Sequence, residues 1–243
     1  MKLPRRIYTT LCKATAVTVA SIGLILVAGA GTAQANGAGA GIVNSPHDFS
    51  AETWNFRGEI CRTCHVPHDH NRTAQLFLNG LLWNHQVSSA TYTMYDAAWS
   101  ETLNNPQSAQ PDGTAKLCLG CHDGTVGLNQ FDSQFGAVGT DFIQDYDPGF
   151  QIPGALNAGD LRGTHPLSIT YNGTDTGLNP DTTTMGTSGT IADVLDNGKV
   201  QCSSCHDVHD GPEAVPNSHL LRVAQTTAQL GNPSGLCLTC HNK

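Results

Sequence analysis

The sequence predicts a mostly irregular fold with short α-helices, long loops and little β-structure. Only 13% of the 243 residues are charged and 6% are aromatic, which is poor material for a conventional apolar core. Gly and Pro contribute 26 and 12 residues, and they favour loops over regular elements. The chain also contains nine cysteines and eleven histidines, which is an unusual number that the fold must explain. We therefore expect something other than Leu and Phe to fill the interior.

The composition also excludes two classes of protein. A large α/β enzyme with a thick sheet would need a richer supply of apolar residues than this chain offers. A nucleic-acid-binding face needs a basic excess, whereas Asp and Glu outnumber Lys and Arg here by 20 to 12. We expect no nucleic-acid partner.

Residues 1–35 have the form of a cleaved signal peptide. Basic residues stand at its start, an apolar run covers 14–28, and Ala33-Gln34-Ala35 has the small-x-small pattern of a signal peptidase site. The alternative is an uncleaved anchor, but the run falls short of the roughly 20 residues that span a bilayer. We expect cleavage before Asn36, no stable membrane anchor, and a location in the periplasm or at the cell exterior.

The cysteines beyond the leader form four pairs, and a histidine follows each pair directly. Two thiols at this spacing add across the two vinyl groups of haem, and the adjoining imidazole reaches the iron from the proximal side. The pattern predicts four covalently attached c-type haems. The attachment residues are Cys61, Cys64, Cys118, Cys121, Cys202, Cys205, Cys237 and Cys240, and the proximal ligands are His65, His122, His206 and His241.

Three other interpretations compete with haem attachment. Pairs of this kind can form zinc sites, exported cysteines often form disulfides, and a single pair can be a thioredoxin-like dithiol. Neither zinc nor disulfides explain a histidine after every second cysteine. A dithiol needs one motif in a βαβ setting, and this chain has four motifs without it.

Four haems would also account for the missing apolar core. We expect a haem-cored chain in which short helices after each motif, and irregular loops elsewhere, wrap the cofactors. The predicted organisation is a leader over 1–35, a flexible Gly/Ala-rich arm over 36–46 and a tetrahaem domain over 47–243. The polar segment 171–190 is expected to be a surface loop or hairpin.

Seven further histidines could supply the distal ligands, so every iron can be bis-histidine ligated. His68 and His209 each lie three residues beyond a proximal histidine and would reach an adjacent haem. His165 precedes a proline and should project from extended backbone. His85 ends an apolar run, and His47 follows the arm. These five are the candidates for four positions.

The other potential ligands are weaker candidates. His70 and His219 lie in polar surroundings and are expected to face solvent. Met94 and Met185 could give His/Met sites of higher potential, but histidine is in surplus.

Several segments together resemble a known family. The sequence looks like the tetrahaem members of the doubled-CxxCH cytochromes of metal-respiring bacteria, and is similar to the OmcE-type extracellular nanowire cytochromes. The resemblance covers most of 47–243, and outside the cysteine motifs it is loose. It is carried by His47-Asp48-Phe49, CRTCHVPH, LLWNH, YTMYD, LCLGCHDGT, GTHPL, CSSCHDVH and LCLTCHNK.

This resemblance implies bis-histidine ligation, closely spaced haems and electron transfer to redox partner cytochromes or extracellular acceptors. In the nanowire branch it also implies a homopolymer in which one iron receives a histidine from a neighbouring subunit. His47 is the candidate for that role because a flexible arm precedes it. The alternative is a monomer in which His47 folds back on its own first haem.

The expected function is therefore electron transfer, with no catalytic residues. The alternatives are a multihaem reductase with one open iron, or a haem subunit of a larger reductase complex. An open iron would stand beside acid and base side chains. Only eight basic residues remain after cleavage, and no cluster of Arg, His and Lys suits that role.

Overall fold

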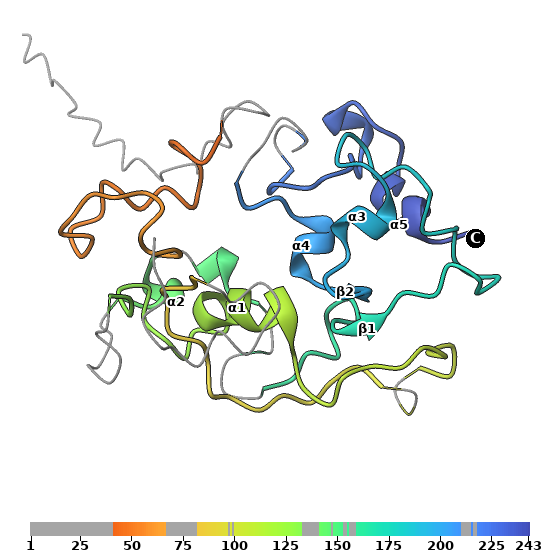
Figure 1. The fold of residues 1–243 in the computed structure, drawn as a ribbon, viewed down its shortest axis with the longest axis horizontal. Helices are drawn as coiled ribbons and strands as arrows, with labels where there is room; N and C mark the ends of the chain where they lie inside the picture. The colour runs from red at the N-terminus through yellow and green to blue at the C-terminus, as the bar shows by residue number, and fades with distance from the viewer. Residues whose placement is uncertain are drawn as a thin grey trace, which may run out of the picture. The chain divides into compact units, whose positions relative to one another are not determined.

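The structure is a computed structural model of the chain, shown in Figure 1. It describes residues 41–66, 82–96, 98, 100–132, 141–146, 148–152, 155, 159–209, 215 and 218–243. All of these belong to the unit formed by Ala33–Lys243. The leader, His68 and His70 lie outside the described residues.

The described residues are mostly irregular, with few short helices and little strand, as the composition predicts. Long stretches of coil connect the elements (Figure 1). In chain order the elements are α1 (Gly113–His122), α2 (Ile143–Tyr146), η2 (Pro148–Phe150), β1 (Ile169–Thr170), α3 (Ile191–Val194), β2 (Lys199–Val200), α4 (Cys202–Cys205), η3 (Thr227–Gln229) and α5 (Gly235–Cys240).

At the second, third and fourth motifs the helix coincides with the motif instead of following it, which corrects the sequence-based expectation there. α1 ends at His122 and contains the second motif, while α4 and α5 end at the last cysteine of the third and fourth motifs. The spacing of the motif explains this, because two cysteines three residues apart share one face of a helical turn.

A two-stranded antiparallel sheet precedes α4. Ile169 pairs with Val200 and Thr170 with Lys199, so β1 is held against the two residues that lead into the third motif. α1 in turn packs against α4. The second and third motifs therefore lie next to each other although eighty residues separate them.

The apolar core that the protein builds from its own side chains is small. Its largest described cluster consists of Tyr92, Leu119, Ala155 and Leu161, with Met94 among the partly buried residues packed on it. Leu119 lies inside the second motif and is fully buried. This core fixes α1, the longest helix among the described residues.

Segment 171–190 is irregular, as predicted, but it also supports the fourth motif. Asn179 donates from Nδ2 to the carbonyls of Leu238 and Thr239, at 3.0 Å each, and its backbone N–H donates to Cys240 at 2.8 Å. The Tyr171 hydroxyl donates to Asn179 O at 2.7 Å. The segment therefore satisfies the last carbonyls of α5, which have no partner inside the helix.

In the described part of the chain, no helix is both long and apolar enough to cross a membrane.

Candidate functional site

Each cysteine motif winds into one helical turn. The backbone N–H of His65 donates to Cys61 O at 2.7 Å, that of His206 to Cys202 O at 3.0 Å, and that of His241 to Cys237 O at 2.8 Å. The second motif has the same conformation because α1 runs through it. The two thiols thus lie on one face of the turn, with the histidine directly after them.

All eight cysteines of the motifs are free thiols in the structure. Removal from water raises the pKa of Cys64 to about 12 and that of Cys205 to about 11, so these thiols are protonated at neutral pH. Among the described residues, no three His, Cys, Asp or Glu side chains converge as the ligands of a single metal ion would.

Three of the four histidines that follow the cysteine pairs, and that are predicted to be proximal ligands, face a second histidine. The ring centroids are 6.2 Å apart for His65 and His209, 6.1 Å for His122 and His47, and 6.2 Å for His241 and His165. Each pair joins segments that are far apart in the sequence. The second histidine is in every case one of the five distal candidates.

The spacing within these pairs suits two imidazoles on one iron. Metal–nitrogen bonds of about 2.0–2.1 Å, with each ring centroid about 1.1 Å behind its nitrogen, place two trans rings about 6 Å apart. The interplanar angles differ, at 28°, 57° and 59°, while the distance stays the same. A shared metal would account for a constant separation at different angles, because each ring could rotate about its own bond to the metal.

Backbone carbonyls select the metal-binding tautomer of two paired histidines, His122 and His165, and of the unpaired motif histidine His206. His122 Nδ1 lies 2.6 Å from Phe150 O, His206 Nδ1 lies 2.8 Å from His219 O, and His165 Nδ1 lies 3.0 Å from Pro166 O. Since a carbonyl only accepts, Nδ1 must carry the proton in each case. The lone pair then lies on Nε2, where an iron can bind it.

Burial favours the neutral form of four of the motif and candidate histidines, which is the form that binds metals. Desolvation, with a smaller contribution from His122, lowers the pKa of His47 to about 4. Desolvation is also the largest cause that lowers the pKa of His65, His206 and His241. These nitrogens are therefore available as ligands at neutral pH.

Aromatic side chains, to which the sequence analysis gave no role at a particular histidine, pack on two of the pairs. Phe49 is buried, and its ring lies edge-on to His47 with centroids 6.3 Å apart; Trp54 packs on Phe49. Trp83 lies edge-on to His65 at 5.9 Å. The segment LLWNH carried a signal for Trp83, because an aromatic residue in an apolar run tends to pack against a nearby ring.

The structure gives the other candidates different surroundings. His85 is 1% exposed, and its two nitrogens lie 2.8 Å from Gln86 O and 3.1 Å from Gly127 O. It faces backbone carbonyls and the sulfur of Cys121, at 3.5 Å from Nε2, instead of a proximal histidine. His219 is exposed. Within the described residues no second imidazole is paired with His206 as the other three are.

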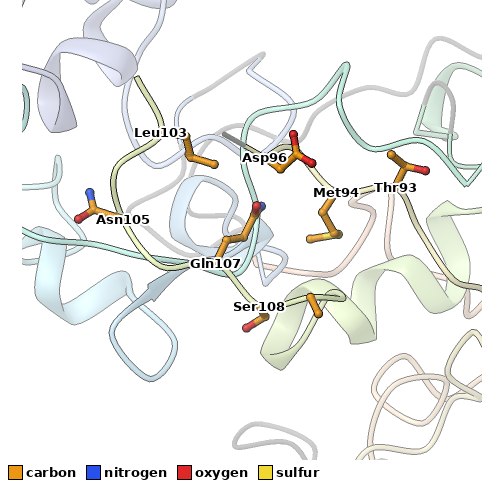
Figure 2. A pocket seen from close by; sticks show the side chains of 8 residues that line it. Thr93, Met94, Asp96, Leu103, Asn105, Gln107 and Ser108 are labelled. Carbon is orange, nitrogen blue, oxygen red and sulfur yellow. The ribbon is translucent and has the colours of Figure 1, made fainter. Parts of the chain in front are cut away.

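Neither Met94 nor Met185 lies against the ring of a motif histidine in a described contact. Met185 is buried at 1% exposure. Met94 lines a pocket of about 440 Å³ together with Asp96, Gln107 and five other residues between positions 93 and 109 (Figure 2). The lining contains no cysteine and no histidine, so this pocket is separate from the motifs.

No protein-family model matches the chain, and a search of curated proteins found no similar sequence.

Proposed function

We propose that this protein is a tetrahaem c-type cytochrome that transfers electrons. The observation that carries the proposal is the pairing of three proximal histidines with three distal candidates at 6.1–6.2 Å. Each of these pairs stands next to two thiols at the spacing that haem attachment requires.

The residues fit the cofactor chemically. Four pairs of thiols would hold four haems, and the neutral imidazoles that follow them would be the proximal ligands. A bound haem supplies one-electron exchange between Fe(III) and Fe(II). The chain itself sets the geometry, the burial and the axial ligands, and thereby the reduction potential. Because the protein's own apolar core is small, we propose that the fold is haem-cored.

We propose His47, His165, His209 and His68 as the four distal ligands. The first three are those that face His122, His241 and His65. His68 is assigned to His206 from the sequence, because it follows the first motif at the same spacing at which His209 follows the third. This leaves His85 as a structural residue.

Complete bis-histidine ligation favours electron transfer over catalysis. A reductase needs an iron with a free position beside acid and base groups. The pairs leave no such position at three of the motifs, and the proposed His68 fills the fourth. The partners would be redox cytochromes or extracellular acceptors reached after export by the leader peptide.

The test combines intact mass with carbon monoxide binding. The exported protein should carry four covalent haems on a chain that begins at Asn36, and carbon monoxide should bind the ferrous form poorly. His209→Ala should free one iron and produce binding to one haem in four. His219→Ala is the matched control, because that side chain is exposed and the hydrogen bond of His206 goes to the backbone carbonyl of residue 219, which alanine keeps; it should leave binding unchanged.

Two results would overturn this proposal. One is a mass that shows fewer than four haems or shows bound zinc. The other is stoichiometric carbon monoxide binding by the unmodified protein, which would indicate the reductase alternative.

The assembly of the protein can be tested at His47. Its ring faces His122 of the same chain, which favours ligation within one subunit over a polymer joined through this residue. His47→Ala should therefore free one iron for carbon monoxide without changing the size of the particle in light scattering. Wild-type filaments that shorten or disappear in this variant would establish the polymer instead.

A further inference from the structure

A network of polar side chains connects the start of α1 with the start of α4. Asp112 is the residue before α1, and Gln201 is the residue before α4. Gln201 Nε2 donates to one carboxylate oxygen of Asp112 at 2.7 Å, and Lys199 Nζ donates to the other at 2.5 Å. Ser108 Oγ donates to that second oxygen at 2.6 Å. The residues that begin two motif-bearing helices are thus bonded directly to each other.

A second set of bonds lies one step further into each helix. The backbone N–H of Thr114 donates to Asp196 Oδ2 at 2.8 Å, and the hydroxyl of Thr114 is hydrogen-bonded to Ser203 Oγ at 2.7 Å. Ser203 lies between the two cysteines of the third motif. The connection between the helices therefore reaches into the motif itself.

The two motifs meet at their sulfur atoms. The side chains of Cys118 and Cys202 lie close enough to interact, and each is the first cysteine of its motif. In the haem-loaded protein each sulfur would be bonded to the edge of its own haem. The haems of the second and third motifs would consequently approach each other edge to edge at this point.

The third motif depends on outside contacts for its position. α4 has four residues and β2 only two, so neither is held by a long run of its own backbone hydrogen bonds. Asp112 bonds to Lys199 in β2 and to Gln201 at the start of α4. One carboxylate directly before α1 therefore holds both β2, which leads into the third motif, and the start of α4, which contains its cysteines.

We propose that Asp112 is the positioning residue of the junction between the second and third haems. It fixes the separation of Cys118 and Cys202, and with it the electronic coupling between the two haems and the rate of electron exchange across this junction. The proposal rests on the proposed function as a tetrahaem cytochrome.

The test measures haem–haem coupling in the fully loaded protein. Neighbouring haems produce a two-signed band in Soret circular dichroism, whose amplitude depends on their distance and orientation. Asp112→Ala should lose the part of this band that comes from the second and third haems, at a temperature where the protein is fully folded. Lys199→Met removes the partner of Asp112 on the side of the third motif, and it should lose the same component of the Soret band. Asp160→Ala is the control, because Asp160 pairs locally with Arg162 at 2.7 Å.

The possible outcomes separate this proposal from the proposed function. Intact mass and a low-spin spectrum first establish that each variant carries four ligated haems, and a wild-type protein without them refutes the proposed function itself. Loaded variants with an unchanged Soret band refute the role of Asp112. If Asp112→Ala does not take up four haems, Lys199→Met decides by the same measurement. If Lys199→Met also fails to take up four haems, the double variant Thr114→Val and Ser203→Ala is measured. An unchanged Soret band in that double variant refutes the positioning network. A loss of thermal stability alone, with the band intact, also counts against the proposal.

Discussion

Gly113 shows at the level of one residue why the second and third motifs can lie so close. Its φ is +49°, in the left-handed region, and a Cβ at this position would lie 2.5 Å from Asp196 Oδ2. That carboxylate cannot simply move away, because it accepts the backbone N–H of Thr114. Only glycine combines this conformation with this approach.

Gly113→Ala should therefore destabilise the folded protein. The left-handed conformation costs a residue with a Cβ about 1–2 kcal/mol, and the displaced Asp196 carboxylate adds to this. Denaturant unfolding of the haem-loaded protein measures the change in free energy. Gly163→Ala is the control, since a Cβ there meets nothing within 4 Å, and it should change the stability little. Equal effects of the two substitutions would contradict the steric argument.

Residue identity predicts the ligand chemistry better than it predicts the ligand partners. The cysteine motifs follow from spacing, and the candidate histidines follow from spacing and from their sequence neighbours. Which histidine faces which motif depends on contacts such as those of Phe49 with His47 and Trp83 with His65, and these join distant segments. The tautomer of His122 depends on the backbone carbonyl of Phe150. Because every residue has a backbone carbonyl, the sequence does not show which one a histidine meets.

At the level of elements, the loop over 171–190 determines how firmly the fourth motif is held. α5 has six residues, none of them buried, so it cannot rely on packing against a protein core. Its last carbonyls are instead bonded by Asn179. Composition identified this segment as irregular, but the polar residues that suggested a solvent-exposed loop also serve as hydrogen-bond donors to α5.

Asn179→Ala should loosen α5 and the histidine that follows it. The side chain makes two hydrogen bonds, each worth about 0.5–1.5 kcal/mol, so we expect a loss of about 1–2 kcal/mol and faster hydrogen exchange of the α5 amides. Asn172→Ala is the matched control in the same loop, because its side chain bonds only to Thr174, at 2.7 Å from the hydroxyl. Protection of α5 that is the same in both variants would show that the loop does not support the helix.

On the scale of the whole molecule, most of the basic residues that the structure describes are engaged in ion pairs with carboxylates. Arg57 and Arg62 pair with Asp132, Lys199 pairs with Asp112, and Arg222 lies 3.9 Å from Asp207. Asp132 is 9% exposed and also accepts a hydrogen bond from Asn84 at 3.0 Å. It links the first motif, through Arg62, to the chain that follows α1.

These pairs predict how stability depends on pH. Burial alone would raise the pKa of Asp132, but the hydrogen bonds from Arg62 and Asn84 and the charges of Arg62 and Arg57 together lower it. For Asp112, burial is likewise outweighed by the bonds from Lys199, Ser108 and Gln201, and its pKa is also lowered. Because an unfolded Asp titrates near pH 3.9, the unfolded state binds more protons below that value.

The stabilisation from both carboxylates is therefore fully present above about pH 5 and is lost as the pH falls below about 4. Asp132→Asn should lower stability at neutral pH and make the decline below about pH 4 shallower, because one of the carboxylates that drive it is gone. Thermal unfolding of the haem-loaded protein across this range measures the slope. Asp181→Asn, at an exposed position of the loop, should leave the acid slope close to that of the wild type. If Asp132→Asn keeps the full slope, the first motif is not held by this charge, and the decline must come from other groups.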